Sequence, residues 1–175
     1  MAWHTVINQP FALGESPFWH ADEQQLYGVD IAGRQLTRTV PGSGLVERWA
    51  MPDEPGCIAP ARSGGVADGL VIALRDRICR APHWGGALHT VAQLPIDAAT
   101  MRANDGKCDA AGRLWVGTVH EPASGPRQPV ASLFCVDGGR APAQVRATLT
   151  GVANANGLAW SPDRRTLYWT DTPTH

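Results

Sequence analysis

The strongest constraint on the fold is a motif that occurs near both ends of the chain. Residues 15–30 read Glu-Ser-Pro-Phe-Trp-His-Ala-Asp-Glu-Gln-Gln-Leu-Tyr-Gly-Val-Asp, and residues 156–171 read Asn-Gly-Leu-Ala-Trp-Ser-Pro-Asp-Arg-Arg-Thr-Leu-Tyr-Trp-Thr-Asp. One constant shift superimposes the Trp, the turn Asp, the Leu-Tyr pair and the final Asp of the two copies. A motif that returns after a long interval is typical of a fold that repeats one structural unit.

A third copy of the motif, Asn-Asp-Gly-Lys-Cys-Asp-Ala-Ala-Gly-Arg-Leu-Trp at 104–115, has a slightly shorter turn. In this alignment Glu15, Asn104 and Asn156 occupy one equivalent position. Repeats that stack radially bring equivalent positions together, so these side-chain oxygens are predicted to meet. Such oxygens suit Ca²⁺, Mg²⁺ or Mn²⁺, and a partly open carboxylate site also suits Zn²⁺. The alternative is that all three only cap local turns.

Composition favours a small or neutral partner. The 175 residues are 43% hydrophobic, and 15 basic against 16 acidic residues give a net charge of -1. A chain with so little excess charge has no basic stripe for nucleic acid or an anionic membrane, so neither partner is expected. The sequence shows no signal peptide and no apolar run long enough to span a membrane, which predicts a cytoplasmic protein.

Short runs of strand-forming residues, separated by Gly and Pro, predict an all-β antiparallel fold. Helical periodicity is almost absent. The expected strands cover residues 25–31, 44–50, 69–74, 77–81, 89–94, 113–119, 132–137, 144–149 and 166–171.

The spacing of the repeat then selects one β architecture. Its anchors fall at Trp19, near Val66, at Cys108 and at Trp160. The intervals average about 40–50 residues, which is the length of a four-stranded propeller blade. A β-sandwich would not bring the same motif back at such intervals. We therefore predict a β-propeller.

On this spacing the chain covers about three and a half blades. A propeller protects its sheet edges by closing into a ring, and such a ring is unclosed. We expect residues 1–175 to be the truncated N-terminal part of a single propeller domain. Residues 3–7 are expected to form a strand that completes the missing last blade, and this fragment alone is expected to be inactive.

Four motifs together resemble the gluconolactonase/regucalcin (senescence marker protein) family of sugar lactonases. They are Leu-Gly-Glu-Ser-Pro-Phe-Trp at 13–19, Arg-Ala-Asn-Asp-Gly-Lys-Cys-Asp-Ala-Ala-Gly-Arg at 102–113, Gly-Thr at 117–118, and Asn-Gly-Leu-Ala-Trp-Ser-Pro-Asp at 156–163. The resemblance extends over the whole chain in order and spacing. It implies a six-bladed β-propeller that hydrolyses sugar lactones with one divalent cation in the mouth of its central channel.

The resemblance also implies roles for individual residues. By position, Glu15 and Asn156 match the metal ligands of the family, and Asn104 moves from the metal to the substrate. The remaining metal ligand of the family, an Asp that is also its proposed base, has no counterpart in this chain. The catalytic residue is therefore left unknown.

A substrate-binding group follows from the same resemblance. Arg102 and Asn104 match the residues that hold the sugar hydroxyls, and Glu121 matches a further substrate contact. Two alternatives stay open at this stage. The alternative for Arg102 is a surface arginine paired with Asp105. The alternative for Glu121 is a solvated loop carboxylate.

The sequence thus predicts metal-dependent hydrolysis of a small-molecule sugar lactone to the aldonic acid, with Ca²⁺, Zn²⁺, Mn²⁺ or Mg²⁺ as cofactor. A second hypothesis is a propeller that binds calcium or a sugar acid without turnover, because a fold does not fix a function. A third is an interaction propeller whose repeated polar position only caps loops. The identity of the lactone, the physiological metal and the oligomeric state do not follow from the sequence.

Overall fold

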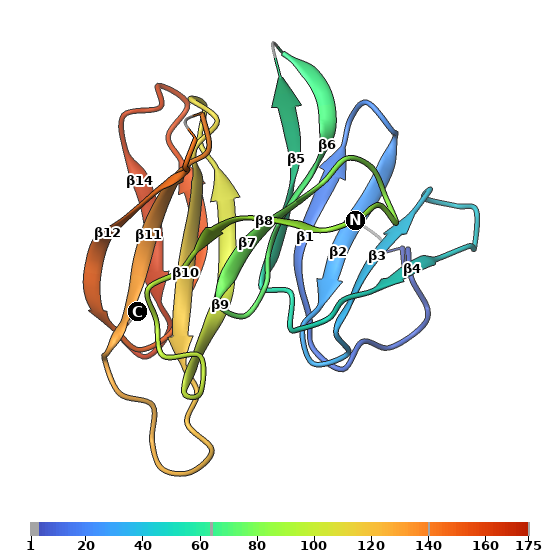
Figure 1. The fold of residues 1–175 in the computed structure, drawn as a ribbon. Coiled ribbons are helices and arrows are strands. Elements are labelled where there is room, and N and C mark those ends of the chain that lie inside the picture. Colours follow the sequence, from blue (N-terminus) through green and yellow to red (C-terminus); the bar gives the residue numbers. More distant parts are fainter. Residues whose placement is uncertain (1–3, 64, 140, 175) are drawn as a thin grey trace.

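The computed structural model describes residues 4–63, 65–139 and 141–174, which form fourteen strands in four antiparallel sheets (Figure 1). The first sheet contains β1 (Gly14–His20), β2 (Gln25–Asp30), β3 (Gln35–Thr39) and β4 (Glu47–Ala50). The second contains β5 (Cys57–Ser63), β6 (Val66–Ala73), β7 (Arg77–Ala81) and β8 (His89–Gln93). The third contains β9 (Met101–Cys108), β10 (Leu114–His120), β11 (Ala131–Asp137) and β12 (Gln144–Val152). The fourth contains β13 (Ala155–Trp160) and β14 (Leu167–Asp171).

Within each sheet the strands follow one another in chain order, as in the blades of a propeller. Figure 1 shows the green second sheet between the blue first sheet and the yellow and orange third sheet. The first strands of the four sheets contact one another across the sheets: β1 meets β5 and β9, and β9 also meets β5 and β13. These four strands are therefore the innermost strands of their blades. The predicted all-β propeller architecture, with an unclosed set of blades, is confirmed.

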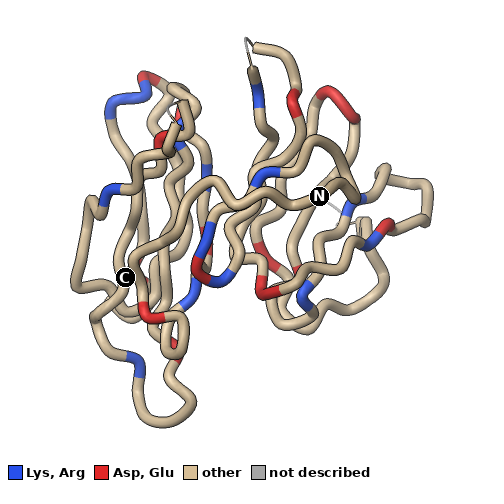
Figure 2. Tube along the Cα trace, in the orientation of Figure 1, with Lys and Arg blue, Asp and Glu red and all other residues tan. Residues whose placement is uncertain are grey.

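No helix occurs among the described residues, so none is available there to cross a membrane. Basic and acidic residues are interspersed over the sheets and their connections (Figure 2).

The predicted strands correspond mostly to the second, third and fourth strands of the blades. The strands that the sequence did not predict are β1, β3, β5, β9 and β13. Four of these five are innermost strands, and they contain Pro, Gly or Asn at irregular positions that are typical of turns. The repeat anchor placed near Val66 is wrong, because Val66 lies in β6 while the innermost strand of that blade is β5.

The expected strand at residues 3–7 is also wrong for residues 4–7, which form no strand. A strand is stable only where a neighbouring strand pairs its backbone groups, and none of the described strands pairs with this segment. Residue 3 lies outside the described residues.

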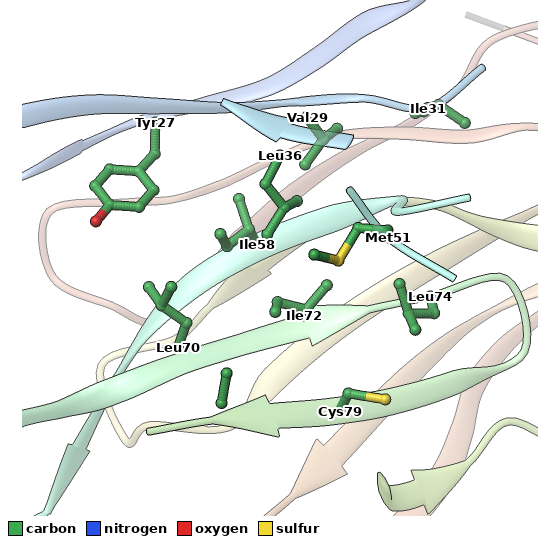
Figure 3. Close-up of a cluster of buried hydrophobic side chains, with 11 residues drawn as sticks. Tyr27, Val29, Ile31, Leu36, Met51, Ile58, Leu70, Ile72, Leu74 and Cys79 are labelled. Atoms are coloured by element: carbon green, nitrogen blue, oxygen red, sulfur yellow. The ribbon is translucent and has the colours of Figure 1, made fainter. Parts of the chain in front are cut away.

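Apolar side chains fill the spaces between neighbouring blades. Between the first and second sheets, Tyr27, Leu36, Ile58 and Ile72 belong to one buried cluster (Figure 3). A second cluster packs the second sheet onto the third and contains Cys57, Ile78, Leu114, Val116 and Phe134. A smaller cluster of Ala131, Val152 and Ala155 lies between the third and fourth sheets. The second and third sheets therefore bury both faces, whereas the first and fourth sheets each take part in one of these clusters, and this burial stabilises the stack.

The final Asp of the repeated motif fixes the start of the innermost strand. Asp30 Oδ1 accepts the backbone N–H of Leu13 at 2.9 Å, and Asp171 Oδ1 accepts that of Asn154 at 2.8 Å. The residue after each Asp adds a second bond at 2.9 Å: the Ile31 N–H donates to the carbonyl of Leu13, and the Thr172 N–H donates to the carbonyl of Asn154. Because both contacted segments lead directly into β1 or β13, the repeat preserves the placement of these strands.

Gly117 allows the third and fourth blades to approach closely. A Cβ at this position would lie 2.4 Å from the Cβ of Ala155, whereas a Cβ at Gly138 would meet nothing within 4 Å. We expect Gly117→Ala to lower the free energy of unfolding by about 1–3 kcal/mol through overpacking. The matched control Gly138→Ala should change it by no more than about 0.5 kcal/mol. Urea unfolding followed by tryptophan fluorescence measures both, and equal losses would contradict this packing.

Candidate functional site

The strand register identifies which residues are equivalent in three of the blades. The leucine of the repeat pairs with the anchor residue of the innermost strand in each: Leu26 with Trp19, Leu114 with Cys108 and Leu167 with Trp160. Three positions further along the second strands, the facing pairs are Val29 with Glu15, Gly117 with Asp105 and Thr170 with Asn156. The position shared by Glu15 and Asn156 is therefore occupied by Asp105 in the third blade.

This register corrects the alignment that placed Asn104 at the shared position. Asn104 falls at a β-bulge of β9, between Ala103, which pairs with Thr118, and Asp105. A bulge adds one residue to one strand, so sequence spacing alone misses the equivalent residue by one. Glu15, Asn104 and Asn156 all lie within the innermost strands and not in the loops before them.

In the second blade the same position holds Ile58. Ile58 pairs with Ile72, the residue before the last of β6. In the first blade Glu15 likewise pairs with Val29, the residue before the last of β2. We call the four equivalent residues the inner ring; they are Glu15, Ile58, Asp105 and Asn156. All four line one pocket of about 560 Å³, the inner pocket. The structure therefore brings together two carboxylates, one amide and one apolar side chain from four blades.

The wall of the inner pocket continues along the innermost strands toward their hairpins. The wall residues Trp19, Pro60, Lys107 and Leu158 lie two to four residues beyond the inner ring on β1, β5, β9 and β13. The polar groups are concentrated at the level of the inner ring, and most of the wall beyond it is apolar. This arrangement places the acidic end of the pocket near the beginning of β1, β5 and β13 and at the middle of β9.

The two carboxylates of the inner ring share a partly desolvated environment. Burial raises the pKa of Glu15, the negative charge of Asp105 raises it further, and Arg102 opposes both effects. Burial also raises the pKa of Asp105, against the lowering effect of the Gly106 and Gly157 amides. Two carboxylates held in this way favour a bound cation, because positive charge relieves their repulsion and desolvation.

The donor set fits a hard divalent cation. Carboxylate and amide oxygens are the ligands of Ca²⁺, Mg²⁺ and Mn²⁺. Among the described residues, no three His, Cys, Asp or Glu side chains are grouped to hold a metal ion. A cation in the inner pocket would therefore depend on the amide oxygen of Asn156 as well as on Glu15.

A second polar group surrounds Arg102, which is only 3% exposed. Its Nε donates to Glu121 Oε2 at 2.8 Å, and its Nη1 donates to Asn104 Oδ1 at 2.8 Å. Arg102 is thus in direct contact with both of the other residues that the resemblance assigns to the substrate. The alternative of a surface Arg102 paired with Asp105 is wrong, because Arg102 is buried and forms its ion pair with Glu121. Glu121 is accordingly ion-paired, with a side chain that is 42% exposed.

Asn104 links this group to the fourth blade. Its Nδ2 donates to Asn154 Oδ1 at 3.1 Å and to the carbonyl of Ala155 at 2.9 Å. Asn154 is nearly buried and lies just before β13, outside the repeated motif. No sequence signal pointed to it. Asp105 could have been found by allowing the third copy of the motif a one-residue bulge.

These observations define the class of protein: a β-propeller with a polar, cation-compatible pocket among its innermost strands. The family model described as "SMP-30/Gluconolactonase/LRE-like region" matches residues 13–175, and the chain belongs to this family.

Named relatives agree with this assignment. The chain is 38% identical to the 6-deoxy-6-sulfogluconolactonase of Pseudomonas putida over 97% of its length and 55% of the relative. It is 35% identical to the regucalcin of Gallus gallus, covering 95% of the chain and 54% of the relative. The solved structure of a calcium-binding protein, regucalcin, from Agrobacterium tumefaciens matches with a TM-score of 0.84 and 26% identity, over 96% of the chain and 53% of the other. The chain therefore spans about half the length of the relatives that it matches.

The Arg102–Glu121 ion pair predicts a pH dependence of stability. The hydrogen bond from Arg102 lowers the pKa of Glu121, against the opposing effect of burial. A carboxyl whose pKa is lower in the folded chain stabilises the fold above its unfolded pKa of about 4.3. That contribution is lost as the pH falls through the folded pKa. Glu121→Gln should therefore destabilise the protein most near pH 7, and its difference from wild type should shrink below about pH 4. Chemical unfolding at a series of pH values measures this difference, and a constant difference would contradict the ion pair.

Proposed function

We propose that the protein hydrolyses a sugar lactone to the corresponding aldonic acid with the help of one divalent cation. The observation that carries this proposal is the inner pocket, where Glu15, Asp105 and Asn156 from three blades converge. The names of the relatives support the substrate class, because they include a 6-deoxy-6-sulfogluconolactonase. Since the chain spans about half of each relative, the activity is proposed for the whole protein.

Glu15 and Asn156 are the proposed metal ligands, for Ca²⁺, Zn²⁺, Mn²⁺ or Mg²⁺. When bound, such a cation supplies Lewis acidity toward the lactone carbonyl. The side-chain oxygen of Asn156 has one weak contact, the 3.2 Å hydrogen bond from the Gly157 amide, so it retains a free lone pair. The Glu15 side chain accepts no hydrogen bond from the described residues, which leaves its carboxylate available to a ligand.

Arg102, Asn104 and Glu121 are the proposed substrate-binding residues. Arg102 is held rigidly by Glu121 and Asn104, so its orientation is fixed before a ligand arrives. Its Nη2 has only a long contact of 3.4 Å to Glu121 Oε1, which leaves a donor for a sugar hydroxyl. The exposed side of the Glu121 carboxylate can accept a second hydroxyl. Fixed donors and acceptors of this kind orient a substrate at low entropic cost.

A second candidate function is binding of calcium or a sugar acid without turnover. One observation favours it: the regucalcin structure that matches this chain is titled a calcium-binding protein. Both functions require the same cation site. They differ in whether the lactone ring is opened.

The decisive experiment measures lactone hydrolysis by acid release at constant pH, with and without a chelator. We expect hydrolysis that chelation abolishes and that Mn²⁺ or Ca²⁺ restores. Glu15→Gln and Asn156→Ala should each lower cation affinity by about tenfold or more. Glu47→Gln is the matched control, because it makes the same chemical change at an exposed carboxylate of β4. Hydrolysis that survives chelation would refute the metal role, and cation binding without hydrolysis would favour the second candidate.

A further inference from the structure

The side chain of Asp105 connects two blades at the inner pocket. Its Oδ1 accepts the backbone N–H of Gly106 at 2.8 Å, within its own strand. Its Oδ2 accepts the backbone N–H of Gly157 at 2.8 Å, across the gap from β9 to β13. Each carboxylate oxygen therefore binds one backbone amide, and the second bond is a contact between the third and fourth blades.

The amide that Asp105 holds belongs to a β-bulge. In the ladder between β13 and β14, Asn156 pairs with Thr170 and Leu158 pairs with Trp169, which leaves Gly157 without a partner residue. Gly157 has a φ of 56°, in the left-handed region that favours glycine. An unpaired backbone N–H needs another acceptor. Asp105 supplies that acceptor.

The bulge directly follows Asn156, the proposed metal ligand. A bulge bends its strand and re-aims the neighbouring side chains, and bulges are frequent next to active sites. Among the described residues, the Asn156 side chain makes only long hydrogen bonds: its Nδ2 donates to Oγ1 of Thr172, just after β14, at 3.4 Å, and its Oδ1 accepts the Gly157 N–H at 3.2 Å. The 2.8 Å hydrogen bond that the Gly157 N–H donates to Asp105 is the shorter restraint on this turn of the backbone.

We infer that Asp105 is a positioning residue: it holds the Gly157 bulge so that the amide oxygen of Asn156 faces Glu15 across the inner pocket. The cation part of this inference rests on the proposed function. Asp105 acts through Asn156, and the acceptor oxygen of its side chain matters more than its charge. The bond to Gly157 also ties formation of the site to the docking of the third blade on the fourth.

Two substitutions separate the acceptor from the charge. Asp105→Asn removes the negative charge but keeps a carbonyl oxygen that can accept the Gly157 N–H. Asp105→Ala removes both. Calcium and manganese titrations, each with the cation alone and no lactone, measure the affinity by isothermal titration calorimetry.

We expect Asp105→Ala to weaken cation affinity by about tenfold or more, as a group that orients a ligand does. Asp105→Asn should remain within about threefold of wild type. In the Asn156→Ala background, Asp105→Ala should add less than about threefold, because the two residues act through one ligand. A loss in Asp105→Asn as large as in Asp105→Ala would overturn the inference, since charge or direct ligation would then dominate.

A second readout does not depend on a cation. In the metal-free protein, hydrogen exchange of the Gly157 amide should be about tenfold faster in Asp105→Ala than in wild type, while Asp105→Asn keeps most of the protection. Unchanged exchange in Asp105→Ala would overturn the positioning role. If the wild type binds neither Ca²⁺ nor Mn²⁺, the proposed function fails, and the Gly157 amide still decides whether Asp105 holds the bulge.

Discussion

The structure depends on an irregularity that all four innermost strands share. Each of β1, β5, β9 and β13 carries a register shift against its second strand. In β1, β9 and β13 the shift lies beside the residue of the inner ring, whereas in β5 it lies further along, between Pro60 and Arg62. A regular strand would turn successive side chains to alternate faces, whereas a bulge re-aims them locally. Because the shifts of the first, third and fourth blades lie beside the inner ring, Glu15, Asp105 and Asn156 can reach one pocket.

The rest of the molecule supports these strands. Asp30 and Asp171 fix the entry to the first and fourth innermost strands, and the apolar clusters between the blades set the spacing of the sheets. Polar links then cross between the third and fourth blades at the level of the site. Asn104 and Asp105 each contact the β13 segment, the former through Ala155 and the latter through Gly157. The same residues that could bind ligands therefore also join the blades.

The sequence predicted the architecture because the repeated residues form the hairpin between the first two strands of a blade and fix the start of the innermost strand. These contacts are local in the sequence. Trp19, Cys108 and Trp160 are equivalent in the structure as the repeat predicted. The prediction from the repeat failed where a bulge adds a residue, because the sequence alignment then put Asn104 at the position that Asp105 occupies. It also failed where Val66 was taken as an anchor, because the second blade has apolar Ile58 in place of a polar inner-ring residue. The contact between Arg102 in β9 and Glu121, just after β10, depends on the pairing register of these two strands, which the spacing in the sequence does not fix.

The central claim is that the inner ring binds a divalent cation through Glu15 and Asn156. The most direct measurement is anomalous X-ray diffraction from a crystal of the protein soaked in Mn²⁺. The account predicts one strong anomalous peak in the inner pocket, within about 2.0–2.6 Å of a Glu15 carboxylate oxygen and of the Asn156 amide oxygen. An inner pocket without such a peak, or a peak bound only by other residues, would contradict it.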